Sequence, residues 1–201
     1  MTKPLILFDW DDTLFSKTEY KKGLRGNLAR ICEASEEEIF EVEERYFNNL
    51  EKSGDFRIDT FIQTFEEKFG KKIQLEDFSS DNLKIYSGAL FPETISVLNN
   101  LKNQFNLGIY SQGFIPLQKI KIKSSGVGDF FDEKFVFIDR DKIATEFLAK
   151  LPDKAIIVED KKEVVEKLKN LNRFKVIWIN RINDEKIPGI KTIKSLLEIT
   201  E

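Results

Sequence analysis

The chain has 201 residues, of which 41% are hydrophobic and 33% are charged, so it is long enough for one well-packed domain or for one domain with a smaller insertion. The formal net charge is −3, and the 32 basic and 35 acidic residues are mixed along the sequence, which argues against polymeric nucleic acid as a partner. The absence of histidine excludes Ser-His-Asp and Cys-His catalysis and histidine-ligated zinc, so any catalysis must rest on carboxylates, hydroxyls, lysines and hard metals.

The first predicted element is a strand, the apolar run PLILFD at residues 4–9, which stops at acidic residues. This run fits neither a membrane span nor a signal peptide, so we expect a cytoplasmic protein without membrane association. Asp9 and Asp11 are like charges, and their proximity is costly unless a proton or a divalent hard metal relieves it. Taken alone, D-x-D-x-T is equally typical of a solvated turn in which Asp12 or Thr13 caps a helix.

A long segment at residues 16–88 follows, with helical periodicity and almost no strand signal. Ser35 and Glu38 form a capping-box pattern at the start of one helix, and SGDF at residues 53–56 interrupts that helix. These features predict an inserted bundle of about four helices.

Strands alternate with helices again from residue 89, where Pro92 stands at the expected first position of a helix. The alternation predicts an α/β fold with a doubly wound parallel sheet. Ligands of such sheets bind beyond the carboxyl ends of the strands, which points to Ser111 and to Glu159 with Asp160 besides the first aspartates. Four further apolar runs predict the remaining strands: LGIYS at 107–111, EKFVFID at 133–139, AIIVED at 155–160 and FKVIWIN at 174–180.

The segment FDWDDTLF at residues 8–15 resembles the first motif of the haloacid dehalogenase superfamily, an apolar strand followed by D-x-D-x-T-L. Ser111 is similar to the second motif, a strand-terminal hydroxyl that binds the phosphoryl group. Lys142 is similar to the lysine of the third motif, and Glu159 with Asp160 to the paired acids of the fourth. The last three matches have plain alternatives, namely a capping serine, a solvated lysine and a charge pair at a helix start.

This resemblance implies a Rossmann-like core of residues 1–15 and 89–201 with a helical cap at residues 16–88. It implies a Mg²⁺-dependent hydrolase of small phosphorylated metabolites, in which Asp9 attacks phosphorus and Asp11 transfers the proton. The dehalogenases of the superfamily lack an acid at the position of Asp11 and need no metal, so dehalogenation is not expected. By the family pattern, two sets of ligands complete the site: Ser111, Gln112 and Lys142 for phosphate, and Asp9, the backbone carbonyl of Asp11, Asp160 and Glu159 for Mg²⁺.

The resemblance also implies that the cap selects the substrate. Lys17, Lys21, Arg25 and Arg57 are the candidates for substrate contact, although each one singly is more typical of an ordinary surface cation. Two other functions stay open, a sugar phosphomutase that uses the same aspartyl phosphate and a non-catalytic binding module on the same scaffold. Release of free phosphate from a sugar monophosphate would argue against the mutase.

Overall fold

The computed structural model describes residues 3–53, 56–74 and 84–200 and has a parallel sheet at its centre. In this part of the chain the sheet has six strands in the order β3-β2-β1-β4-β5-β6. Every pair of neighbouring strands is parallel, so all carboxyl ends of the strands lie at one edge of the sheet. The strands are β1 (Leu5–Phe8), β2 (Asn106–Gln112), β3 (Val136–Asp139), β4 (Ile156–Glu159), β5 (Lys175–Ile179) and β6 (Lys191–Ile193).

Helices cover both faces of the sheet. Alternate residues of each strand point to opposite sides, so both faces carry apolar side chains that helices can bury. Ile6 and Phe8 of β1 belong to one hydrophobic cluster with side chains of α4 and α5, whereas Leu7 belongs to a second cluster with α6 and α7. The predicted doubly wound α/β core is confirmed, and no described helix is long and apolar enough to cross a membrane. The helices of the core are α4 (Thr94–Leu101), α5 (Ile115–Ser124), α6 (Thr145–Leu148) and α7 (Lys162–Asn170), with short 3₁₀ helices η3 (Ser87–Ala89), η4 (Gly128–Phe130), η5 (Glu133–Phe135) and η6 (Leu196–Thr200).

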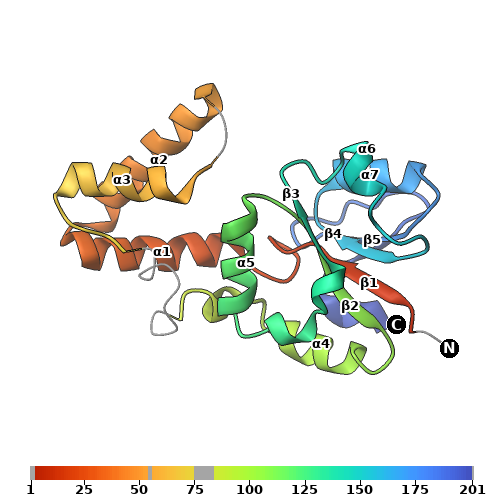
Figure 1. Cartoon of the computed structure of the whole chain (residues 1–201). Helices are drawn as coiled ribbons and strands as arrows, with labels where there is room; N and C mark the ends of the chain where they lie inside the picture. Colours follow the sequence, from red (N-terminus) through yellow and green to blue (C-terminus); the bar gives the residue numbers. More distant parts are fainter. Residues whose placement is uncertain (1–2, 54–55, 75–83, 201) are drawn as a thin grey trace.

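Between β1 and β2 the chain leaves the sheet and forms a helical insertion, which extends to the left of the sheet in Figure 1. Its described α-helices are α1 (Lys17–Cys32), α2 (Glu36–Ser53) and α3 (Ile58–Phe69). At the start of α2, the backbone N–H of Glu38 donates to Ser35 Oγ at 3.2 Å and that of Ser35 donates to Glu38 Oε2 at 2.9 Å, as the capping-box pattern predicts. The predicted bundle of about four helices also spans residues 75–83, which lie outside the described residues.

The insertion and the core are joined by apolar packing. Buried side chains of α1, α2 and α3 belong to the same hydrophobic cluster as those on one face of the sheet. The junction contains a row of aromatic rings whose consecutive centroids are 5.4 Å apart: Trp10, Phe15, Tyr20 and Tyr86. The loop after β1 is therefore packed directly against the first helix of the insertion.

Three elements of the core differ from the sequence predictions. The strand β6 was not predicted, because a run of three residues carries too weak a periodic signal. The alternation of strands and helices predicts a helix near residues 141–150, after the strand EKFVFID, but the helix there is only the four-residue α6. Pro92 lies in a turn two residues before α4, which begins at Thr94.

Gly108 gives a test of how tightly the central strands pack. A Cβ atom at this position would lie 2.4 Å from the Phe135 carbonyl oxygen and 2.7 Å from Leu7 Cδ2. The Phe135 backbone cannot move away from a new Cβ atom without distorting the sheet. Gly108→Ala should therefore lower the free energy of unfolding by about 2 kcal/mol or more, measured by denaturant titration. The matched control is Gly88→Ala, whose Cβ would have nothing within 4 Å, and an equal loss in both variants would contradict the packing argument.

Candidate active site

Asp9 lies at the carboxyl edge of the sheet, directly after β1. Its backbone N–H donates to the Val158 carbonyl at 2.8 Å, and the residue is buried with 3% of its surface exposed. β1 pairs with β2 on one side and with β4 on the other, so the strand order reverses here. This reversal is the position at which open α/β sheets bind ligands.

Lys142 joins the end of β1 to the end of β4. Its ammonium group donates to Asp9 Oδ1 and to Glu159 Oε2, both at 2.6 Å, and all three side chains are buried. The Tyr110 hydroxyl donates to the Lys142 carbonyl at 2.6 Å and so holds the turn that carries the lysine. The structure therefore brings together three predicted residues that are far apart in the sequence.

The electrostatics of this group are set by burial. Burial raises the pKa of Asp9 to about 6, although the positive charge of Lys142 opposes the rise. Burial together with the neighbouring Asp9 also raises the pKa of Glu159. For Lys142 burial acts in the opposite direction, but the carboxylates of Asp9 and Glu159 outweigh it and raise the pKa of the lysine. The lysine is therefore charged, and the carboxylates remain incompletely neutralised.

The same edge of the sheet offers ligands for a divalent cation. Carboxylate oxygens of Asp9, Glu159 and Asp160 lie within 4.8 Å of one another. The Asp160 Oδ1 atom is buried and has no hydrogen-bond partner among the described residues. Three carboxylates and one ammonium group leave a formal charge of −2, which is equal in size and opposite in sign to the charge of Mg²⁺. The donor set thus fits a hard divalent metal.

Asp11 is held by the core helix α5 and does not belong to the carboxylate cluster of Asp9, Glu159 and Asp160. Its carboxylate accepts from Gln118 Nε2 at 2.9 Å and from Lys121 Nζ at 2.9 Å, and both donor residues are buried. The sequence analysis missed these two residues. Their spacing of three positions on the helix that follows Ser111 was the available signal, since it places both on one helix face.

Ser111 and Gln112 end β2 beside this group. Ser111 is buried, and its Oγ accepts from Gln118 Nε2 at 3.3 Å. The Gln112 carbonyl accepts from the same nitrogen at 2.9 Å, while the Gln112 residue is exposed. Gln118 therefore links the two predicted phosphate-binding residues to Asp11.

The loop between Asp9 and α1 is fixed by backbone contacts. The Trp10 carbonyl accepts from the backbone N–H groups of Leu14 and Phe15, both at 3.1 Å. Asp12 has a positive φ of 65°. The carbonyl of Thr13 accepts from Arg181 Nη2 at 3.0 Å. These contacts hold the loop that carries Asp11 against the core, in addition to its packing against α1.

The cations predicted to contact substrate occupy different places. Lys17 pairs with Asp12 at 2.7 Å, and Lys17 and Lys21 both line a cavity of about 230 Å³ that also contains Asp11. Arg25 pairs with Glu43 at 2.5 Å, and Arg57 pairs with Asp59 at 2.7 Å; neither arginine lines this cavity. Of the four, the structure brings only the two lysines to the neighbourhood of Asp11.

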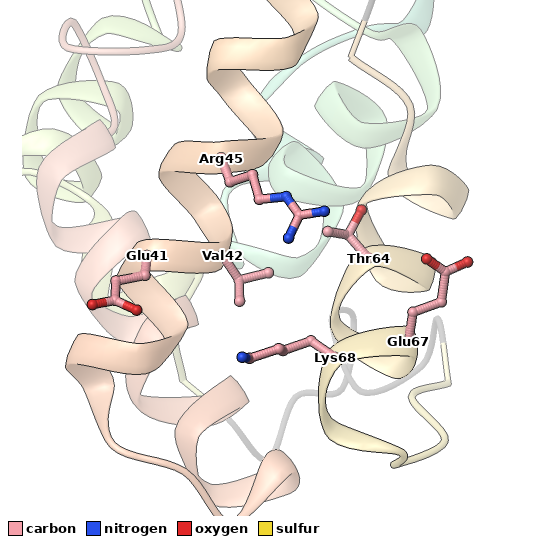
Figure 2. A pocket seen from close by; sticks show the side chains of 6 residues that line it. All are labelled: Glu41, Val42, Arg45, Thr64, Glu67 and Lys68. Atoms are coloured by element: carbon pink, nitrogen blue, oxygen red, sulfur yellow. The ribbon is translucent and has the colours of Figure 1, made fainter.

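A second hollow of about 320 Å³ lies between α2 and α3 (Figure 2). Arg45 and Lys68 point into it, whereas the carboxylates of Glu41 and Glu67, which also belong to its lining, point away from it. It contains none of the residues at the carboxyl edge of the sheet, and this hollow is not the candidate active site.

Comparison with known proteins identifies the family. Residues 3–179 match the family model described as haloacid dehalogenase-like hydrolase. No curated protein matches the sequence significantly.

Three solved structures share the fold. The HAD hydrolase YfnB from Bacillus subtilis, described as bound to magnesium, has 18% identity and a TM-score of 0.62, with 99% of this chain and 97% of that chain covered. A HAD phosphatase from Thermococcus onnurineus has 24% identity and a TM-score of 0.58, covering 99% and 96%. A protein from Burkholderia xenovorans described as a haloacid dehalogenase-like hydrolase has 20% identity and a TM-score of 0.68, covering 98% and 94%. At these identities the likeness concerns the fold alone.

Lys142→Met tests the electrostatic role of the buried lysine. Removing the ammonium group leaves Asp9 and Glu159 buried without a cation, so the free energy of unfolding should fall by about 3 kcal/mol near pH 8 without divalent metal. A buried carboxyl with a raised folded-state pKa stabilises the folded state when protonated, so the deficit should shrink as the pH falls toward about 5.

The control is Lys134→Met, since Lys134 pairs with Asp132 and its side chain is 66% exposed. Thermal and denaturant unfolding should give this control variant the same free energy of unfolding as the wild type. A deficit in Lys142→Met that grows at low pH would contradict the argument.

Proposed function

This chain belongs to the haloacid dehalogenase-like hydrolases, and we propose that it is a Mg²⁺-dependent phosphomonoester hydrolase of small phosphorylated metabolites. The observation that carries the proposal is the environment of Asp9, a buried carboxylate bonded to Lys142 and grouped with Glu159 and Asp160. Asp11 lies two residues further on and outside this group. A nucleophile and a separate proton donor are thus both available at the end of β1.

In the first half-reaction, an Asp9 carboxylate oxygen forms a bond to phosphorus while the bond from phosphorus to the substrate oxygen breaks. Protonated Asp11 gives its proton to that oxygen, so the alcohol leaves and an aspartyl phosphate remains. In the second half-reaction, ionised Asp11 takes a proton from water and the resulting hydroxide attacks phosphorus. Inorganic phosphate leaves, Asp9 is restored and Asp11 is protonated again.

Lys142 and Ser111 have the supporting roles. Lys142 supplies a fixed positive charge beside Asp9. The Ser111 hydroxyl accepts from Gln118 and would donate its own hydrogen to a phosphoryl oxygen. Asp9, the Asp11 carbonyl and Asp160, with Glu159 close by, would hold Mg²⁺. When bound, this ion supplies the positive charge that lets a carboxylate approach a phosphate dianion.

The Asp11 side chain favours phosphoryl transfer over dehalogenation. Loss of a halide needs no proton donor, whereas an alkoxide leaving from phosphorus does. In this chain an acid occupies that position, and Gln118 and Lys121 hold its carboxylate in place. The charge of −2 at the metal cluster points the same way, since a metal-free site gains nothing from it.

The cations of the insertion favour hydrolysis over sugar phosphomutation. A mutase must hold a second phosphate while it rebinds the intermediate, which calls for convergent cations. Lys17 pairs with Asp12, Arg25 with Glu43, and Arg57 with Asp59, so each of these three cations already has a carboxylate partner. Lys21 lies 3.8 Å from Glu43, the carboxylate that Arg25 also contacts.

Asp9→Asn tests the nucleophile. Phosphate release from a panel of sugar phosphates, nucleotides, FMN and phosphorylated acids with Mg²⁺ should fall at least about a thousandfold, because an amide cannot form the aspartyl phosphate. The control is Asp153→Asn, since Asp153 precedes β4 at the opposite edge of the sheet and its side chain is 71% exposed. Equal residual activity in Asp9→Asn and wild type would indicate contamination. If the wild type released no phosphate from any compound of the panel, the result would favour a mutase or a binding role.

Asp160→Asn tests the metal site. Mg²⁺ at ten times its Kd should raise the wild-type free energy of unfolding by about 1.4 kcal/mol, and the variant should lose this gain because Asp160 belongs to the cluster. The control is Asp12→Asn, since Asp12 lies outside the cluster and asparagine tolerates its positive φ.

The metal requirement of the reaction is tested separately. EDTA should abolish phosphate release, and Ca²⁺ should inhibit it because its looser coordination spoils the alignment of Asp9 with phosphorus. Full activity in EDTA would refute the metal requirement.

A further inference from the structure

The cavity that contains Asp11 lies between the insertion and α5. It has a volume of about 230 Å³ and does not include Asp9, Glu159 or Asp160. Asp160 instead borders a different cavity, which it shares with Asp12. Under the proposed function Asp11 protonates the departing oxygen, so the cavity on its side is the place for the leaving group.

The wall of this cavity is mainly apolar, and its aromatic rings come from both the insertion and the core. The rings of Phe47 and Phe56 are nearly parallel, with an angle of 16° between their planes and 6.0 Å between their centroids. Phe56 and Phe61 follow at 5.6 Å. The apolar lining consists of Leu24, Phe47, Phe56, Ile58, Phe61, Phe114 and Leu117.

Most polar and charged groups of the lining already pair with other protein groups. Gln118 Nε2 donates to Asp11 and to the Gln112 carbonyl, and Lys121 pairs with Asp11. Glu43 accepts from Arg25, which lies outside the lining, and lies 3.8 Å from Lys21. Gln118 Oε1 is buried without a hydrogen-bond partner among the described residues, so it can accept from a hydroxyl of the leaving group. Further hydroxyls of a polyhydroxylated leaving group would lie against apolar walls, and each unpaired hydroxyl weakens binding about tenfold or more.

We infer that the leaving group is an alcohol that carries a flat aromatic or heteroaromatic ring, and not a polyhydroxylated sugar; this inference rests on the proposed function. Aromatic ligands stack on aromatic side chains more favourably than their buried area alone predicts. A volume of about 230 Å³ lies below the range of about 300–1,000 Å³ that is usual for drug-sized ligands, which favours one or two rings.

Ligand affinity tests the inference without relying on turnover. Benzylphosphonate and dihydroxybutylphosphonate share the phosphonate group and differ in the part that enters the cavity. Calorimetric titration of the Asp9→Asn variant with Mg²⁺ should give about tenfold tighter binding of the benzyl compound. Equal affinities, tighter binding of the diol, or no binding of either compound at millimolar concentration would overturn the inference.

Phe47→Leu in the same background tests the aromatic wall. The side chain stays apolar but loses its ring, so the preference for the benzyl compound should fall about fivefold. The matched control is Phe69→Leu, because Phe69 is also partly buried, lies on α3 and does not line the cavity. Phe114→Leu makes the same test from the core side if Phe47→Leu folds poorly. A preference unchanged in both variants of the lining would contradict an aromatic wall.

Turnover then connects the cavity to the reaction. Pyridoxal 5′-phosphate and glucose 6-phosphate are both esters of primary alcohols, and the first should have at least about tenfold higher kcat/KM. A faster reaction with the sugar would overturn the inference while leaving the phosphatase intact. A benzyl preference in binding without any Asp9-dependent phosphate release would instead count against the proposed function alone.

Discussion

The arrangement of the site depends on one electrostatic constraint, the grouping of three carboxylates around a single edge of the sheet with one buried ammonium group. Lys142 neutralises part of this charge by bonding to Asp9 and to Glu159. Burial raises the pKa of Asp9 despite the opposing charge of Lys142, and the negative charge of Asp160 adds to the rise. Burying such a set of charges is costly for folding, and in our proposal a divalent cation would restore the charge balance.

The parallel sheet is what makes this grouping possible. β1 and β4 are neighbours although about 150 residues separate them, so their carboxyl ends place Asp9 and Glu159 side by side. The turn before α6 then brings Lys142 between them. The catalytic candidates all come from the core, on short strands and on turns that backbone hydrogen bonds join to neighbouring elements, such as the bond from Asp9 N–H to the Val158 carbonyl.

The insertion contributes a different part of the chemistry. Its helices share a hydrophobic cluster with one face of the sheet, and its phenylalanines form one wall of the cavity beside Asp11. This division between core and insertion has a physical reason. Charged groups need fixed dipoles and charged neighbours, which the edge of the sheet supplies, whereas an apolar wall needs only a suitable shape and apolar area. In our proposal the core therefore determines the reaction and the insertion determines the leaving group.

The sequence alone determined the elements with strong periodicity and the residues at the ends of its strands. Five of the six described strands, the capping box of α2 and the family motifs were read from local patterns, because each depends on neighbours within a few positions. Only the tertiary structure decided which distant groups meet. It placed Lys142 between Asp9 and Glu159, gave Asp11 the partners Gln118 and Lys121, and separated Arg25 and Arg57 from the cavity of Lys17 and Lys21. These outcomes depend on helix rotation and on strand order, which a one-dimensional pattern of apolar and charged residues does not encode.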